Sequence, residues 1–144
     1  TTSASSIDTL SSLTALAKGF APLMNDKGSV IAMTYLGAHR VVPGYNVMGI
    51  AKAALEASIR YLAADLGKKN IRVNGISAGP INTLAARGIA HFSDLLKLAK
   101  DRTMFNRNTV PEEVGDVAVF LASELSRGMS GDVMYVDNGF HAMI

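Results

Sequence analysis

The chain has 144 residues, 49% of them hydrophobic, and a formal net charge of +2. This length suits one packed domain, and the small charge, without a basic stripe of interleaved aromatics, argues against a nucleic-acid partner. The absence of cysteine excludes disulfides and cysteine-bound metals, and the three histidines lack metal-ligand spacing. The sequence contains neither an apolar run of membrane-spanning length nor a signal-peptide pattern, so a cytoplasmic, non-membrane protein is expected.

The pattern of apolar residues predicts alternating helices and strands. Helical spacing predicts helices over about 7–24, 45–66 and 110–123, and a shorter helix between 84 and 107. Apolar runs predict strands over 29–33 and 133–136, and Ile71-Arg-Val-Asn-Gly-Ile76 is predicted as a further strand. The stretch Thr109-Val-Pro-Glu112 predicts a capping box with proline in the first turn.

This order predicts an α/β fold with a Rossmann-like, doubly wound parallel sheet. Three strands are few for that architecture, and no glycine-rich turn near the start supplies a phosphate-binding fingerprint. A sheet of three parallel strands would also leave a bare edge. We therefore expect residues 1–144 to be the second half of a larger domain rather than a small three-stranded domain.

The stretch from Thr34 to Lys52 carries the first candidate for chemistry. It follows a predicted strand, crosses a loop that contains Gly37, Pro43 and Gly44, and enters the helix expected over 45–66. Seven residues are close to two helical turns, so Tyr45 and Lys52 are predicted within ~20° of one helix face and ~10 Å apart. A phenol and an ammonium there can stabilise and protonate a developing oxyanion. The spacing alone equally allows an unrelated surface tyrosine and lysine.

Five stretches carry a resemblance that runs from about Leu13 to the end of the chain. They are Tyr35-Leu-Gly-Ala38 with Pro43-Gly-Tyr-Asn-Val-Met-Gly-Ile-Ala-Lys-Ala-Ala-Leu55, Ile71-Arg-Val-Asn-Gly-Ile-Ser-Ala-Gly-Pro-Ile-Asn-Thr-Leu-Ala85, Glu113-Val-Gly-Asp116, Ser130-Gly-Asp-Val133 and Val136-Asp-Asn-Gly-Phe140. In order and spacing they resemble the bacterial type I enoyl-[acyl-carrier-protein] reductases, a divergent branch of the short-chain dehydrogenase/reductase superfamily. Only the C-terminal half of that family is covered.

The resemblance implies an oxidoreductase of fatty acid biosynthesis in which NADH reduces the trans-2 double bond of enoyl thioesters on acyl carrier protein. It implies one dinucleotide-binding catalytic domain, of which 1–144 is the C-terminal part, a homo-oligomer expected to be a tetramer, and no metal. The alanines and the glycine of residues 84–90, followed by a short amphipathic helix, predict a flexible substrate-binding flap over about 84–96, expected to order when cofactor and substrate bind.

The same resemblance assigns the site residues. Catalytic roles fall to Tyr45, Tyr35 and Lys52. The cofactor would meet Lys52, Gly79, Pro80, Ile81, Asn82, Thr83, Leu84 and Ala85. The substrate would meet Tyr35, Tyr45, Met48, Ile89 and Phe92. Two positions depart from the family pattern. Asn82 stands where the family has a basic residue, and Asn138 stands where it has a glycine. Asn138 is therefore expected to adopt a left-handed turn conformation.

Two other interpretations stay open. A carbonyl-reducing short-chain dehydrogenase would carry tyrosine four residues before the lysine and serine thirteen residues before that tyrosine, where this chain has Met48 and Tyr35. A non-catalytic dinucleotide-fold domain would use the helix over 45–66 mainly for assembly. The Tyr45 and Lys52 pair separates an enzyme from the non-catalytic domain, because a purely structural domain has no need of both residues.

Overall fold

A computed structural model describes residues 12–82 and 92–143. Its sheet has three parallel strands in the order β1-β2-β3: β1 is Ser29–Thr34, β2 is Arg72–Ala78 and β3 is Val133–Val136. The register pairs Ser29 with Arg72 and Gly75 with Val133. The predicted α/β class and parallel pairing are confirmed. The strands extend one to two residues beyond the predicted ends, except β3, which matches.

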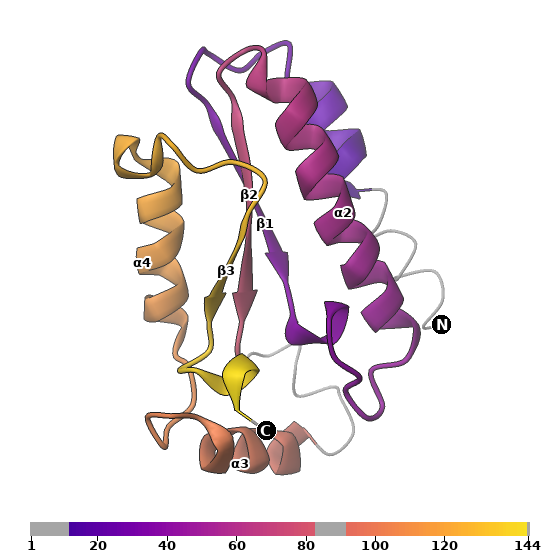
Figure 1. The fold of residues 1–144 in the computed structure, drawn as a ribbon, viewed down its shortest axis with the longest axis vertical. Helices are drawn as coiled ribbons and strands as arrows, with labels where there is room; N and C mark the ends of the chain where they lie inside the picture. The colour runs from indigo at the N-terminus through magenta and orange to yellow at the C-terminus, as the bar shows by residue number, and fades with distance from the viewer. Residues whose placement is uncertain (1–11, 83–91, 144) are drawn as a thin grey trace.

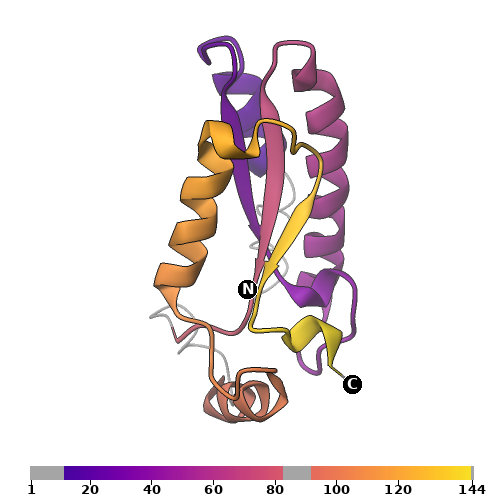
Figure 2. The ribbon, with the colours of Figure 1, turned by 60° about the vertical axis from the view of Figure 1, so that its left-hand side comes forward.

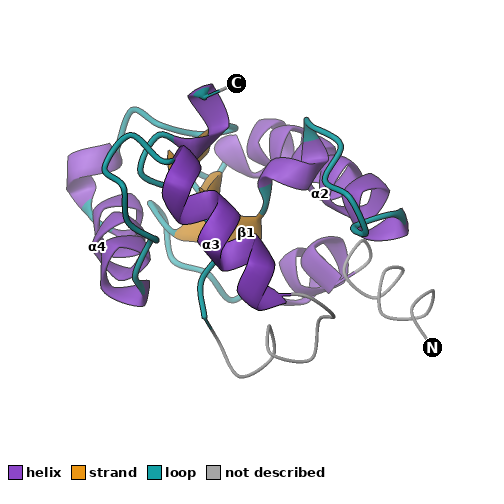
Figure 3. Cartoon of the chain, turned by 90° about the horizontal axis from the view of Figure 1, so that it is seen from below, coloured by secondary structure: helices purple, strands orange, loops and turns teal. Residues whose placement is uncertain are grey.

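Helices cover both faces of the sheet (Figures 1 and 2). The long helix α2, Val47–Gly67, and a helix over residues 12–20 lie on one face, and α4, Pro111–Ala122, lies on the other. Seen from below, α3, Phe92–Arg102, crosses the carboxyl ends of the strands (Figure 3). Three short 3-10 turns complete the described chain: η1 Leu36–Ala38, η3 Glu124–Ser126 and η4 Phe140–Ala142.

The core lies between α2 and the sheet. Leu55 and Ile59 of α2 pack with Ala32 of β1 and Val73 of β2, and Ile59 and Val73 have no exposed surface. Burial of a side chain such as Ile59 contributes about 1.5–3 kcal/mol. A Cβ on Gly75 would lie 2.9 Å from Ile59 Cδ1, so glycine at this position lets the helix approach the strand closely.

Three predicted helix ends are corrected. The first helix ends at residue 20 rather than 24, and its predicted beginning lies outside the described residues. Helix α2 begins at Val47, two residues late, because Gly44 and Asn46 have φ angles of 79° and 44° that no helix accommodates. The N-cap of α4 is Val110, whose N–H donates to Glu113 Oε2 at 3.0 Å, so the capping carboxylate lies one residue later than predicted.

Candidate active site

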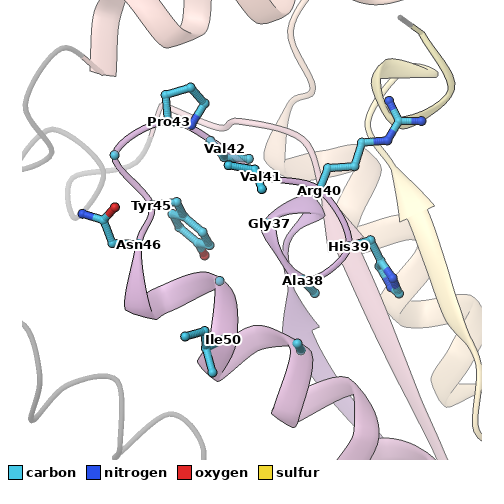
Figure 4. A pocket seen from close by; sticks show the side chains of 13 residues that line it. Gly37, Ala38, His39, Arg40, Val41, Val42, Pro43, Tyr45, Asn46 and Ile50 are labelled. Carbon is cyan, nitrogen blue, oxygen red and sulfur yellow. The ribbon is translucent and has the colours of Figure 1, made fainter.

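The predicted chemistry collects at the carboxyl end of β1. The chain leaves β1 at Thr34, turns through η1, and returns through a loop to the first turn of α2. A cavity of about 380 Å³ lies between this loop and α2, and Tyr45, His39 and Ile50 line it (Figure 4). The carboxyl ends of parallel strands are where α/β sheets place their ligands.

Tyr45 lies in the turn before α2 and not on the helix itself. Its N–H donates to the Val42 carbonyl at 3.0 Å, and its own carbonyl accepts from Met48 N–H at 3.1 Å. A Cβ on Gly37 would overlap the Tyr45 ring, so the absence of a side chain there admits the phenol against η1. The helical-face argument for Tyr45 and Lys52 is therefore wrong in detail, because the backbone between them is helical only from Val47.

Tyr35 lies beside Tyr45. Their ring centroids are 5.1 Å apart with planes at 63°, an edge-to-face contact. Burial raises the pKa of Tyr35, and burial followed by the nearby Tyr35 phenol raises the pKa of Tyr45 to about 12. The Tyr35 hydroxyl is buried without a hydrogen-bond partner in the part of the chain that the structure describes. Both phenols are therefore protonated donors at neutral pH.

Lys52 points to the end of β1. Its ammonium donates to the Met33 carbonyl at 2.9 Å, and across residues 12–82 and 92–143 no hydrogen bond joins it to Tyr45. Lys52 lines a separate, smaller cavity of about 190 Å³ with Met33 and Leu16. Burial lowers the pKa of Lys52, and the negative charge of Glu56 partly offsets this.

The predicted cofactor segment leaves the carboxyl end of β2. Gly79 N–H donates to the Val136 carbonyl at 2.9 Å, so the segment begins against the end of β3. Pro80 is buried, Ile81 is half-buried and Asn82 is exposed. Thr83, Leu84, Ala85 and Ile89 lie outside the described residues, as does most of the flap predicted over 84–96.

The remaining predicted substrate residues fall on two helices. Met48 is half-buried in the first turn of α2, and Phe92 is the first residue of α3.

Asn138, predicted to occupy a left-handed turn, has a φ of 54°. Asn74, in the middle of β2, is fully buried, and its side-chain bonds within the described residues go to backbone, at Met129 O and Asp132 N.

Sequence reasoning missed one group at this site, the side chain of Glu56. It is 2% exposed on α2, accepts a hydrogen bond from Thr34 Oγ1 at 2.7 Å, and lies against His39 Nε2. A signal was present, because Glu56 stands beside Leu55 and three residues before Ile59 on the apolar stripe of the helix. A carboxylate in such a stripe is rarely buried unless it is paired.

Two kinds of feature are absent from the described residues. No group of three or more histidine, aspartate or glutamate side chains there could hold a metal ion. None of the helices in that part of the chain has both the length and the apolar character needed to cross a bilayer.

Comparison with known proteins gives the family. The family model described as "Enoyl-(Acyl carrier protein) reductase" matches residues 4–141. The chain is 58% identical over 130 residues to the NADH-dependent enoyl-[acyl-carrier-protein] reductase FabI of Bacillus subtilis strain 168, a match covering 90% of this chain and 50% of that protein.

Two solved structures are also similar. One is the Bacillus cereus enoyl-acyl carrier protein reductase with NADP+ and indole naphthyridinone, with a TM-score of 0.89 and 52% identity over 92% of this chain and 52% of that one. The other is the Anaplasma phagocytophilum reductase in complex with NAD, with a TM-score of 0.87 and 45% identity over 94% and 50%. The chain spans about half the length of the curated relatives it matches. By its sequence and its fold, this chain belongs to the enoyl-(acyl carrier protein) reductase family.

Proposed function

We propose that the protein reduces the trans-2 double bond of enoyl thioesters carried on acyl carrier protein, with NADH as reductant, in fatty acid elongation in the cytoplasm. The observation that carries the proposal is the pair of protonated phenols, Tyr35 and Tyr45, at the carboxyl end of β1. The family membership of the chain and the B. subtilis relative's NADH-dependent reductase name agree with it. Residues 1–144 would form the C-terminal part of one dinucleotide-binding catalytic domain.

The described residues fit a nicotinamide dinucleotide. Lys52 has three ammonium protons, and the Met33 carbonyl takes one of them, so two can reach ribose hydroxyls. Ile81 and Asn82 emerge from the carboxyl end of β2, where the backbone of Ile81 can meet the nicotinamide amide. We propose that Gly79, Pro80 and residues 83–85 complete this contact. When bound, NADH would supply a hydride to C3 of the substrate.

Tyr45 would stabilise the charge that develops on the substrate. After reduction at C3, negative charge appears on the thioester oxygen, and the Tyr45 hydroxyl would donate a hydrogen bond to it. A pKa of about 12 keeps the Tyr45 proton in place for this task at neutral pH. C2 then collects a proton, for which Tyr35 is a second donor with its hydroxyl unengaged by the rest of the described chain. Met48, Ile89 and Phe92 would contact the acyl chain.

The proposed acid, Tyr45, does not stand at the position where a carbonyl reductase carries its tyrosine, and this displacement has a chemical reason. In carbonyl reduction the hydride and the acid act on adjacent atoms, whereas in enoyl thioester reduction the charge appears on an oxygen remote from C3. Met48 occupies the position where a carbonyl reductase would carry its tyrosine, and methionine cannot donate a proton. This favours reduction of the double bond.

A single assay tests the proposal. The complete protein that contains residues 1–144, called the full chain below, is mixed with NADH and either crotonyl thioester or acetoacetyl thioester. The loss of NADH absorbance is then followed. We expect turnover of the crotonyl substrate alone. Turnover of the acetoacetyl substrate alone would identify a carbonyl reductase, and NADH binding without turnover of either would leave the non-catalytic assembly domain.

We also propose that the protein is a homo-oligomer, and specifically a tetramer. Its support is apolar surface on neighbouring helices of one face: Leu16 and Phe20 are 56% and 57% exposed, and Ile50 of α2 is 72% exposed. Isolated exposed apolar residues are ordinary, but large ones gathered on adjoining helices are typical of interfaces. Light scattering on the purified full chain measures the mass, and a monomer at micromolar concentration contradicts the proposal.

A further inference from the structure

Glu56 is a buried carboxylate that the proposed reaction does not use. It lies one helical turn after Lys52 on α2 and is 2% exposed. Burying a carboxylate is costly unless hydrogen bonds or an opposite charge offset the loss of water. The contacts that Glu56 makes therefore indicate which parts of the structure its buried carboxylate holds in place.

Those contacts reach both ends of one short turn. Glu56 Oε1 accepts from Thr34 Oγ1 at 2.7 Å, and Thr34 is the last residue of β1. Glu56 Oε2 makes no hydrogen bond within the described residues but lies against Nε2 of His39, the C-cap of η1, so the two form an ion pair when the imidazole is protonated. One carboxylate thus connects α2 to the first and last residues of the segment 34–39.

The segment 34–39 supports the groups assigned to the chemistry. It contains Tyr35, and its Gly37 provides the surface against which the Tyr45 ring packs. The residue just before it, Met33, supplies the carbonyl that holds the Lys52 ammonium. A shift of this segment would therefore move both phenols and the partner of Lys52 together.

We propose that Glu56 is a positioning residue, whose carboxylate clamps both ends of the turn 34–39 and thereby holds the two phenols and Lys52 in place. The inference rests on the proposed function for its catalytic consequence, while the clamp itself rests on the contacts above. Glu56 acts through its neighbours and has no contact with the reacting atoms.

The charge of Glu56 gives the clamp an electrostatic signature. The titratable groups that face it are His39 from the loop, Lys52 from its own helix and Tyr135 from β3, and Arg40 lies near Tyr135. Burial lowers the pKa of Lys52 and the negative charge of Glu56 raises it. Loss of that charge leaves burial unopposed, so the Lys52 ammonium would lose its proton at a lower pH.

The test compares Glu56→Gln, Thr34→Val and Thr34→Ser in the full chain, with the exposed Glu112→Gln on α4 as the matched control. Circular dichroism checks the fold, and crotonyl thioester reduction with NADH gives kcat and KM. Labelling of Lys52 by an acylating reagent, read by mass spectrometry across pH, gives its ionisation without any need for activity.

We expect Glu56→Gln to lower kcat by about ten-fold to a hundred-fold, as loss of a hydrogen bond to a charged group predicts, with a smaller change in KM. The basic limb of the kcat profile and the Lys52 labelling midpoint should both move to lower pH. Thr34→Val should lower kcat and leave both midpoints in place, and Thr34→Ser should restore kcat. Glu112→Gln should match the unaltered protein.

Two results overturn the inference: an unmoved Lys52 midpoint in folded Glu56→Gln, or equal kcat for Thr34→Val and Thr34→Ser. If Glu56→Gln does not fold, the Thr34 pair decides alone. An inactive unaltered protein would instead refute the proposed function, and the labelling midpoints would still decide whether Glu56 sets the charge of Lys52.

Discussion

The ring of Tyr45 lies edge-on to the ring of Tyr35, with 5.1 Å between their centroids. The two residues enter the site from opposite ends of one loop, Tyr35 directly after β1 and Tyr45 two residues before α2. An aromatic pair of this geometry contributes about 0.5–1.5 kcal/mol beyond the burial of its surface. The contact therefore brings the two ends of the loop together and places the two phenols side by side.

Tyr45→Phe should slow crotonyl thioester reduction by about a hundred-fold, because one donor to a developing oxyanion is lost. NADH binding, followed by its fluorescence, should change little, since the phenol is assigned to the substrate. Tyr61→Phe, which alters a tyrosine 78% exposed on α2, is the control and should be neutral. Unchanged turnover in Tyr45→Phe would remove Tyr45 from its role and make Tyr35 the next residue to replace.

Lys52→Met should damage NADH binding and turnover together. The ammonium is expected to donate to ribose hydroxyls, and the loss of hydrogen bonds from a charged group should raise the Kd by about ten-fold to a hundred-fold. Titration calorimetry with NADH measures the change, and the exposed Lys69→Met serves as the control for loss of one positive charge. A variant that binds NADH normally yet turns over slowly would contradict the assignment of Lys52 to the cofactor.

Alkaline titration should reveal the buried phenols. Because the folded-state pKa of Tyr45, about 12, lies above the ordinary tyrosine value of 10.0, the unfolded chain releases this proton first. The corresponding stability is complete below pH 10 and is lost as the pH rises through about 12. Urea unfolding across this window should show a smaller loss of stability in Tyr45→Phe.

Tyr35→Phe provides a second test of the same electrostatics. It removes the neighbouring phenol that helps raise the pKa of Tyr45, so phenolate absorbance from Tyr45 should appear at lower pH. Burial is the larger cause and remains, which limits the size of the shift. A Tyr45 titration that is identical with and without Tyr35 would show that the two phenols do not interact.

Gly79→Ala and Gly115→Ala should have opposite effects on stability. A Cβ on Gly79 would lie 2.6 Å from Thr109 Oγ1 and 3.2 Å from Asp137 Cα, so overpacking should cost about 1–3 kcal/mol. Gly115 lies in α4, where a Cβ would meet nothing within 4 Å, so alanine there should add about 0.5–1 kcal/mol. Urea unfolding measures both, and a neutral Gly79→Ala would show that the start of the cofactor segment can yield.

The sequence predicted the elements whose causes are local and missed those that depend on distant contacts. Apolar runs located β1 and β3, because buried parallel strands are nearly continuously hydrophobic. The start of α2 was misplaced because Asn46 adopts a positive φ that its identity permits but does not require. The N-cap of α4 is Val110 rather than Thr109, whose hydroxyl is buried towards Gly79 and makes no hydrogen bond within the described residues.

The candidate site shows the same division. The resemblance supplied Tyr35, Tyr45 and Lys52 by position, and two phenols in contact agree with it. The direction of the Lys52 side chain depends on the Met33 carbonyl, and the burial of Glu56 depends on Thr34, twenty-two residues away. Pairings of this kind arise only when the strand and the helix pack, so spacing within one helix could not predict them.

Asn74 fixes the alignment of the last strand. Its side-chain N–H donates to the Met129 carbonyl at 2.9 Å, and its side-chain oxygen accepts from the Asp132 N–H at 3.2 Å. One side chain therefore bonds to both ends of the turn that leads into β3. Displacing β3 by a single residue along β2 would break both bonds and leave the fully buried amide of Asn74 unpaired. The strand β3 consequently has one favoured register on β2. The position of residues 137–143, which follow β3, therefore depends on Asn74, a residue in the middle of the chain.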